Sequence, residues 1–277
     1  IIIDTLRLDY SQGLEALRDL GFIKYNNAIA PAPWTLPSHV SIVTGLYPSQ
    51  HGVHEAYGIY AGDSLMNIGQ TRLSSLNYGI FGELKNEGYN VYLITANPFV
   101  SPWYGFNRVD GLIHVRAFEY SIDNSYLNDL LIKYGSNHTR LFKNLVRENK
   151  WSLAVKGVYY YARSKLDQAL VKAGLSEKPL LEKGSKLIEH VINETLKGKT
   201  IYGVDLRSAP FLLFINMMEA HAPYTGKDLK DVLSAEFFLK SVFEGKAPDE
   251  AINIWRKRYP RHAAYAVDRA LSIVKAL

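Results

Sequence analysis

The 277-residue sequence contains no cysteine, which excludes disulfide bonds, thiolate metal sites and a cysteine nucleophile. It also contains no apolar run long enough to cross a bilayer, and no signal peptide can be recognised, so we expect no membrane span and a cytoplasmic location. Internal repeats and low-complexity tracts are absent as well. The remaining composition, 47% hydrophobic and 21% charged, is typical of a globular protein with a large core.

The charge balance is mildly basic, with a net charge of +5. This excess suits anionic substrates or surfaces, but it is too small to indicate nucleic acid. Basic and aromatic residues alternate between 121 and 199, where the pattern is mostly helical. We interpret this region as solvated amphipathic helices whose lysine stems cover apolar surface, because that is the usual role of such residues. The sequence therefore predicts one domain over 1–277, with a helical insertion or cap at 121–199 and no nucleic-acid partner.

Three apolar runs, at 1–3, 90–97 and 210–218, are typical of strands buried on both faces of a parallel sheet. They end at or shortly before Asp4, Asn97 and His221. Ligands of open α/β sheets bind at the carboxyl ends of the strands, so we expect these polar residues to lie near one edge. Each also has a structural interpretation: Asp4 as a turn cap, Asn97 as a turn former before proline, and His221 as a core hydrogen-bonding group.

The rest of the chain carries weaker local patterns. They predict helices at 11–20, 76–86, 228–246 and 248–277, short strands at 22–27 and 112–115, and a surface loop at 57–71.

The stretch from 33 to 53 places a hydroxyl beside a helix start. Proline is favoured at the first helical position, and the residue before a proline avoids the α region. We therefore expect Leu36 to be extended and a helix from Ser38 to Val43, ending at Gly45. Thr35 then lies in a loop facing the helix N-terminus, where free N–H groups favour an anion. Thr35 is either a nucleophile or only a helix cap, and the local sequence alone favours the cap.

Several motifs resemble those of the sulfatases of the alkaline phosphatase superfamily. The main one runs Thr35-x-Pro-Ser, an apolar helix, Thr-Gly, then Tyr-Pro and His51-Gly. Asp4-Thr-Leu-Arg, the Gly-Tyr-strand unit that leads to Asn97, and His221-x-Pro-Tyr resemble further parts of that family. The resemblance covers nearly all of this sequence but only the front part of a complete enzyme, because the family's Ser-Asp-His-Gly metal motif would follow Leu277.

The resemblance implies an α/β fold of the alkaline-phosphatase-like sandwich type, with a mainly parallel central sheet flanked by helices. It implies a divalent metal (Zn, Mn, Ca or Mg) bound by Asp4 and Thr35, with Thr35 as the catalytic nucleophile. It places His221 at the active site beside the transferred group. It also implies substrate binding by His39, where the family usually has arginine, and by Asn97, where many members have lysine and histidine.

Two positions depart from the sulfatase pattern. Thr35 cannot become the formylglycine that sulfatases make from Cys or Ser, and Thr5 stands where many members have a second metal-binding Asp. A Thr nucleophile is instead found in the phosphodiesterase and phosphoethanolamine- or phosphoglycerol-transferase branches. We therefore expect a metal-dependent hydrolase of phosphate or sulfate esters, acting on a small-molecule or glycan- or lipid-linked anionic ester. A phospho-headgroup transferase and a non-catalytic protein that keeps the fold are the alternatives.

Overall fold

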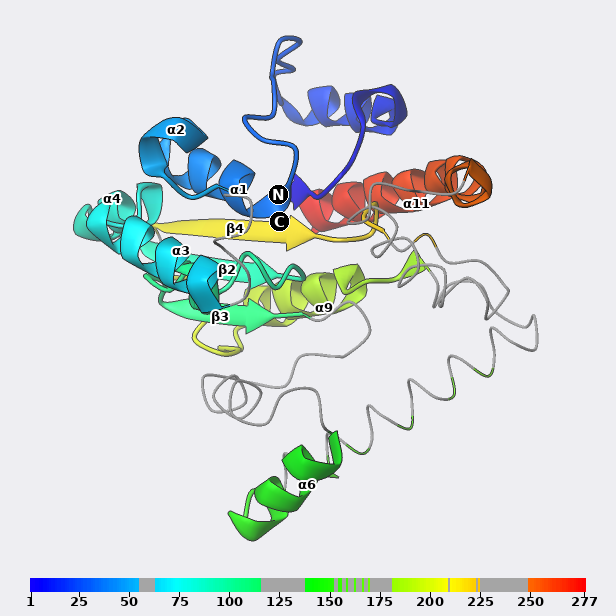
Figure 1. Cartoon of the computed structure of the whole chain (residues 1–277). Helices are drawn as coiled ribbons and strands as arrows, with labels where there is room; N and C mark the ends of the chain where they lie inside the picture. The colour runs from blue at the N-terminus through cyan, green and yellow to red at the C-terminus, as the bar shows by residue number, and fades with distance from the viewer. Residues whose placement is uncertain are drawn as a thin grey trace.

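The computed structural model describes residues 1–54, 63–115, 138–151, 181–208, 210–222, 224 and 249–277, with isolated positions between 154 and 169. A four-stranded parallel sheet forms its centre, in the order β1-β4-β2-β3. The strands are β1 (Ile2–Ile3), β2 (Asn90–Thr95), β3 (Gly111–His114) and β4 (Phe211–Met217). Figure 1 shows β3 and β4 pointing the same way. The predicted α/β class with a parallel sheet is confirmed.

Helices surround this sheet. The described α-helices are α1 (Thr35–Thr44), α2 (Pro48–His51), α3 (Asp63–Ser75), α4 (Ile80–Asn86), α6 (His138–Arg147), α9 (Ser185–Leu196) and α11 (Asp249–Ala276). Three 3-10 helices are η1 (Leu8–Tyr10), η2 (Gln12–Leu20) and η3 (Pro102–Tyr104). None of the described helices combines the length and apolarity needed to cross a membrane.

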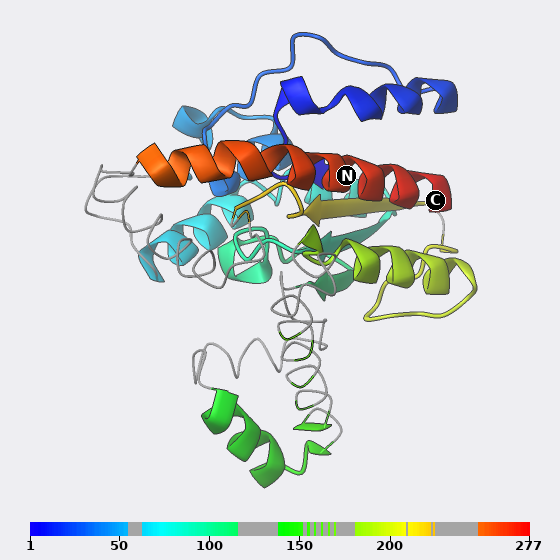
Figure 2. The same ribbon diagram turned by 90° about the vertical axis from the view of Figure 1, so that its right-hand side faces the viewer.

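The sheet is buried on both faces, as its continuous apolar strands predict. Along β2, Val91 and Leu93 pack into a core with α1, α3 and α4, while Tyr92 and Ile94 pack into a second core with α9 and α11. Side chains of successive strand residues point to opposite faces, so one strand serves both cores. The two views in Figures 1 and 2 show helices on both sides of the strands.

The last part of the predicted insertion at 121–199 packs against the sheet. Ile188 and Ile192 of α9 are fully buried against the sheet, so α9 belongs to the core. By contrast, α6 lies away from the sheet in both views (Figures 1 and 2). Residues 116–137 and most of 152–180 lie outside the described residues, as does the predicted helix at 228–246.

Two local predictions were wrong. Residues 22–27 do not form a strand, and Ile23 and Tyr25 are 79% and 80% exposed. No strand among the described residues pairs with them. The predicted loop at 57–71 is α3 from Asp63 onward.

A shallow groove of about 380 Å³ lies where η1 and η2 meet α11. Its lining includes Tyr10, Gly13, Pro260 and Val267, and none of the predicted site residues.

Candidate active site

Asp4 follows the last residue of β1 and continues its pairing, because its N–H donates to the carbonyl of Met217 at 2.9 Å. The next residue, Thr5, has φ +60, a backbone conformation that β-branched residues rarely adopt. The Thr5 hydroxyl donates to the Ala220 carbonyl at 2.7 Å. The chain therefore turns sharply out of the sheet immediately after Asp4, and it is bonded there to the segment that follows β4.

Helix α1 begins earlier than the sequence predicts. Its first residue is Thr35 and its N-cap is Trp34, so Pro37 is the third helical residue and Leu36 is not extended. A proline is tolerated there because the first four N–H groups of a helix have no intrahelical acceptor. Leu36 is fully buried, and this packing overrides the preference of a residue before proline. The predicted end at Gly45 is confirmed, with φ +72.

The start of α1 at Thr35 determines which contact the Thr35 side chain makes. Trp34 makes no side-chain capping hydrogen bond, and Thr35 is not the cap. The Thr35 hydroxyl instead donates to Oδ2 of Asp4 at 3.1 Å, away from the helix. The alternative interpretation of Thr35 as only a helix cap is therefore wrong.

Asn97 completes a buried group with these two residues. Its amide Nδ2 lies 2.7 Å from Oδ2 of Asp4 and 3.3 Å from Oγ1 of Thr35. Its Oδ1 accepts from the N–H of Phe99 at 2.9 Å, which orients the amide nitrogen toward Asp4. Asp4 and Thr35 are each 8% exposed and Asn97 is 1% exposed. Asn97 thus forms the turn that its place before proline suggests, and it also contacts both other residues.

His39 lies one helical turn beyond Thr35 and is buried. Its Nδ1 donates to the Thr35 carbonyl at 2.9 Å, since a carbonyl can only accept. Its Nε2 then accepts from the amide of Asn216 in β4, also at 2.9 Å. Burial lowers the pKa of His39, which favours this neutral form. Both ring nitrogens are used inside the protein, so His39 fixes the first turn of α1 and has no free nitrogen for the predicted substrate contact.

His221 lies just beyond the carboxyl end of β4, at the edge of the sheet where Asp4 leaves β1. Its backbone N–H donates to the Met218 carbonyl at 2.9 Å. Its ring Nδ1 donates to the Ala222 carbonyl at 2.6 Å, which leaves Nε2 as the nitrogen that can meet a ligand. Among the described residues no hydrogen bond joins His221 to Asp4 or Thr35. The structure thus brings Asp4, Thr35 and Asn97 into contact, and it places His221 at the same edge without contact.

The residues at this edge do not complete a metal site by themselves. Asp4 offers a carboxylate and Thr35 a hydroxyl, but Asn97 turns its amide nitrogen toward them. Over the described part of the chain, no group of three or more His, Cys, Asp or Glu residues could hold a metal ion. The predicted cation therefore lacks a full set of protein ligands in this part, and we derive no chemical step through it.

Sequence reasoning missed three residues that organise this edge. Asn216 holds His39, and the hydroxyl of Tyr259 in α11 donates to the Thr5 carbonyl at 2.9 Å. Lys183 donates from Nζ to the carbonyl of His221. A polar residue inside the apolar run of β4 was a usable signal for Asn216. No such sequence signal marks Tyr259 or Lys183, because both lie in helical patterns where exposed residues of the same types are common.

Comparison with known proteins adds no relative: no protein-family model, curated protein or solved structure matches this chain. The resemblance to sulfatases therefore depends on the sequence motifs alone.

Proposed function

We propose that this protein is a phosphate-ester hydrolase that uses Thr35 as its nucleophile. The hydrogen bond from the Thr35 hydroxyl to the Asp4 carboxylate is the observation that carries the proposal. A hydroxyl is a weak nucleophile until a neighbouring base accepts its proton, and Asp4 occupies that position. The alkaline-phosphatase-like arrangement of the whole enzyme is part of this proposal.

The proposed reaction has two steps. As the Thr35 Oγ–phosphorus bond forms, Asp4 accepts the hydroxyl proton and the bond between phosphorus and the leaving oxygen breaks. Protonated His221 donates a proton from Nε2 to that oxygen. Water then attacks phosphorus while neutral His221 accepts the water proton on Nε2. Asp4 returns its proton to Oγ as the Oγ–phosphorus bond breaks, which releases phosphate and restores Thr35, Asp4 and His221.

Asn97 and the start of α1 assist this chemistry in different ways. The Asn97 amide contacts both Asp4 and Thr35, so it fixes the nucleophile against its base. The first N–H groups of α1 have no intrahelical acceptor, and they can donate to the oxygens on which charge develops. Such preorganised donors are commonly the largest contribution to transfer of this kind.

An assay that compares substrate classes would test this proposal. The full-length gene product would be assayed with an aryl phosphodiester, an aryl phosphomonoester and an aryl sulfate that share one leaving group. We expect phosphate turnover to exceed sulfate turnover, because Thr35 cannot supply a formylglycine hydrate. An added alcohol acceptor would divert the product to a new ester if the protein is a transferase. Sulfate turnover without phosphate turnover would contradict the proposal.

A further inference from the structure

Two charged residues beside His221 are buried and have no role in the chemistry above. Lys183, just before α9, is 1% exposed, and Glu219, just after β4, is 0% exposed. Burial lowers the pKa of the Lys183 ammonium to about 7, opposed by the Glu219 carboxylate, and burial also raises the pKa of Glu219. Burying such groups costs free energy unless they are paired or hydrogen-bonded, so their contacts indicate what they do.

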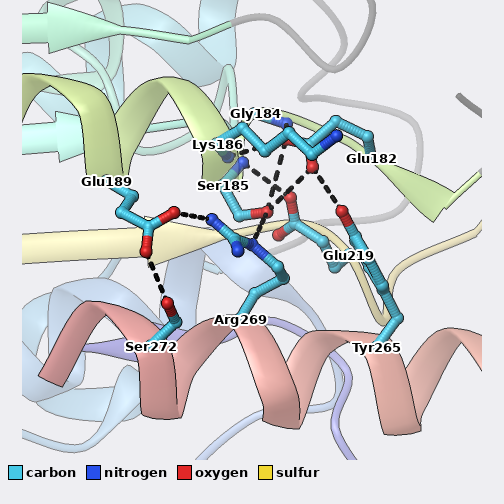
Figure 3. Close-up of polar contacts among 9 residues, drawn as sticks. All are labelled: Glu182, Gly184, Ser185, Lys186, Glu189, Glu219, Tyr265, Arg269 and Ser272. Atoms are coloured by element: carbon cyan, nitrogen blue, oxygen red, sulfur yellow. Dashed lines mark hydrogen bonds and ion pairs between the residues drawn. The ribbon is translucent and has the colours of Figure 1, made fainter. Parts of the chain in front are cut away.

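Glu219 binds the start of α9. Its Oε1 accepts from the N–H of Lys183 at 3.1 Å and from the N–H of Ser185 at 2.8 Å. The N-cap of this helix is Gly184, which has no side chain to cap it. A carboxylate is the favourable partner for a helix N-terminus, and here it comes from the segment after β4. Figure 3 shows Glu219 pointing at Ser185.

Lys183 makes the reciprocal contact. Its Nζ donates to the carbonyl of His221, two residues after Glu219. Its ammonium also lies 5.9 Å from the centre of the Tyr224 ring, within cation–π range. The turn from Glu219 to His221 is therefore bonded to the start of α9 at both of its ends.

A second set of contacts fixes α9 itself. Glu182 accepts from the N–H groups of Gly184 and Lys186 and from the hydroxyl of Tyr265, which lies in α11. Farther along, Arg269 and Ser272 of α11 donate to Glu189 of α9. Figure 3 shows these side chains bridging the two helices. The helix start that holds the turn is thus anchored to a long core helix.

We propose that Lys183 and Glu219 are positioning residues for His221. Their reciprocal hydrogen bonds hold the turn so that Nδ1 of His221 stays on the Ala222 carbonyl and Nε2 faces the leaving group. This inference rests on the proposed function, in which His221 protonates that group. A merely structural role would affect all substrates alike, whereas positioning of an acid affects those whose leaving group needs a proton.

The test compares Lys183→Met with Lys186→Met, which removes the amino group of an exposed lysine at the same helix start. Turnover is measured on an aryl and an alkyl phosphodiester, because only the poor alkyl leaving group depends on protonation. Lys183→Met should lower kcat for the alkyl ester at least about tenfold more than for the aryl ester, with little change in KM. Lys186→Met should match the wild type. Equal losses on both esters would overturn the proposal.

A double mutant adds an internal control. In the His221→Ala background, Lys183→Met should cause no further loss on the alkyl ester, because the group it positions is gone. Additive losses would contradict positioning through His221.

An NMR measurement that requires no catalysis tests this inference separately from the proposed function. Long-range proton–nitrogen NMR of the wild-type protein reports which ring nitrogen of His221 carries the proton. The inference requires protonated Nδ1 in the neutral ring, and a mixture of tautomers in Lys183→Met. Wild-type His221 protonated on Nε2 would overturn it, whether or not the protein hydrolyses esters and whether or not the variant folds. Absence of all ester turnover would overturn the proposed function. The NMR measurement would still show whether Nδ1 of His221 donates to the Ala222 carbonyl.

Discussion

The Thr35 side chain has one use in the fold and a different one in the proposed chemistry. Within the fold its hydroxyl makes two hydrogen bonds: it donates to Asp4 and accepts from the amide of Asn97. The hydroxyl of Thr44, at the other end of the same helix, also makes two: it donates to the Val40 carbonyl and accepts from the N–H of Leu46. Because the two hydroxyls are structurally comparable, they form a matched pair in which only one has a proposed chemical role.

Thr35→Ala and Thr44→Ala should therefore differ in activity and agree in stability. Each should cost about 1–3 kcal/mol of unfolding free energy, the usual net value of two hydrogen bonds. Only Thr35→Ala should reduce turnover, by about a thousandfold or more, as deletion of a nucleophile does. Thr35→Ser should keep partial activity. Thermal denaturation and steady-state kinetics would show this, and wild-type turnover in Thr35→Ala would contradict the nucleophilic role.

His39 gives a pH-dependent prediction. Its folded pKa lies below the ordinary value of 6.5, chiefly because of burial. The unfolded chain therefore binds more protons between these two pKa values, and stability should fall as pH decreases through that window. His39→Gln should lose this part of the acid sensitivity between about pH 7 and about pH 5, while His190→Gln, at an exposed position of α9, should keep it. Melting temperatures at both pH values would decide, and identical acid sensitivity in all three proteins would contradict neutral burial of His39.

Some of these residue contacts could be predicted and others could not. Strand ends of a parallel sheet share an edge, so the approach of Asp4 and Asn97 follows from apolar runs alone. The direction of the Thr35 hydroxyl cannot be predicted in this way, because it depends on the residue at which α1 begins. The packing of Leu36 determines that start. The contact of His39 with Asn216 joins residues far apart in sequence, and no local pattern encodes it.

At the scale of elements, a glycine sets how closely α4 approaches α1. A Cβ on Gly79 would lie 2.2 Å from the carbonyl oxygen of Val43, and Gly79 also has φ +56. Gly45 has a similar φ of +72, but a Cβ there would meet nothing within 4 Å. Both glycines adopt a backbone conformation that favours glycine, and only Gly79 is also confined by backbone.

Gly79→Ala should consequently destabilise the protein much more than Gly45→Ala. At Gly45, with φ +72 and ψ 9, the left-handed conformation costs an alanine roughly 1–2 kcal/mol. Gly79, with φ +56 and ψ −135, lies in a region that residues other than glycine avoid more strongly. The added clash at Gly79 must push α4 away from the end of α1, the helix that carries Thr35. Denaturant unfolding of the two variants would compare them directly, and equal losses of unfolding free energy would show that the helices adjust without cost.

Local sequence patterns predicted an element well where the element has its own hydrophobic periodicity. They predicted it poorly where contacts with distant residues determine the secondary structure. β2, β3 and β4 lie where their apolar runs predict. The glycine and polar residues of α3 suggested a loop, but Gly69 is needed because a Cβ there would lie 2.6 Å from the Tyr104 carbonyl oxygen. Residues 22–27 have side chains typical of strands, yet in the described part of the chain no strand pairs with them.

At the scale of the whole molecule, the parallel sheet buried on both faces could be predicted, but its order β1-β4-β2-β3 could not. Apolar runs indicate that strands are central, and they do not say which strands are neighbours. That order places β1 next to β4, and so brings the Asp4 turn to the segment that carries His221.

We expect the complete protein to depend on a metal ion. The sequence motifs imply a divalent cation, so chelation with EDTA should abolish phosphate-ester turnover in the full-length gene product, and added Mn or Zn should restore it. The melting temperature measured alongside separates loss of metal from loss of fold. Full turnover after exhaustive chelation would contradict metal dependence and leave Asp4 acting as the base alone.

The central claim is that phosphorus becomes bonded to Thr35 during turnover. The most direct measurement is peptide mass spectrometry of the full-length protein, quenched in acid during steady-state hydrolysis of an aryl phosphomonoester. The proposal predicts a phosphate on the peptide that contains Thr35, its absence without substrate, and its absence in Thr35→Ala. Rapid turnover with an unmodified Thr35 peptide, together with retained activity in Thr35→Ala, would contradict it.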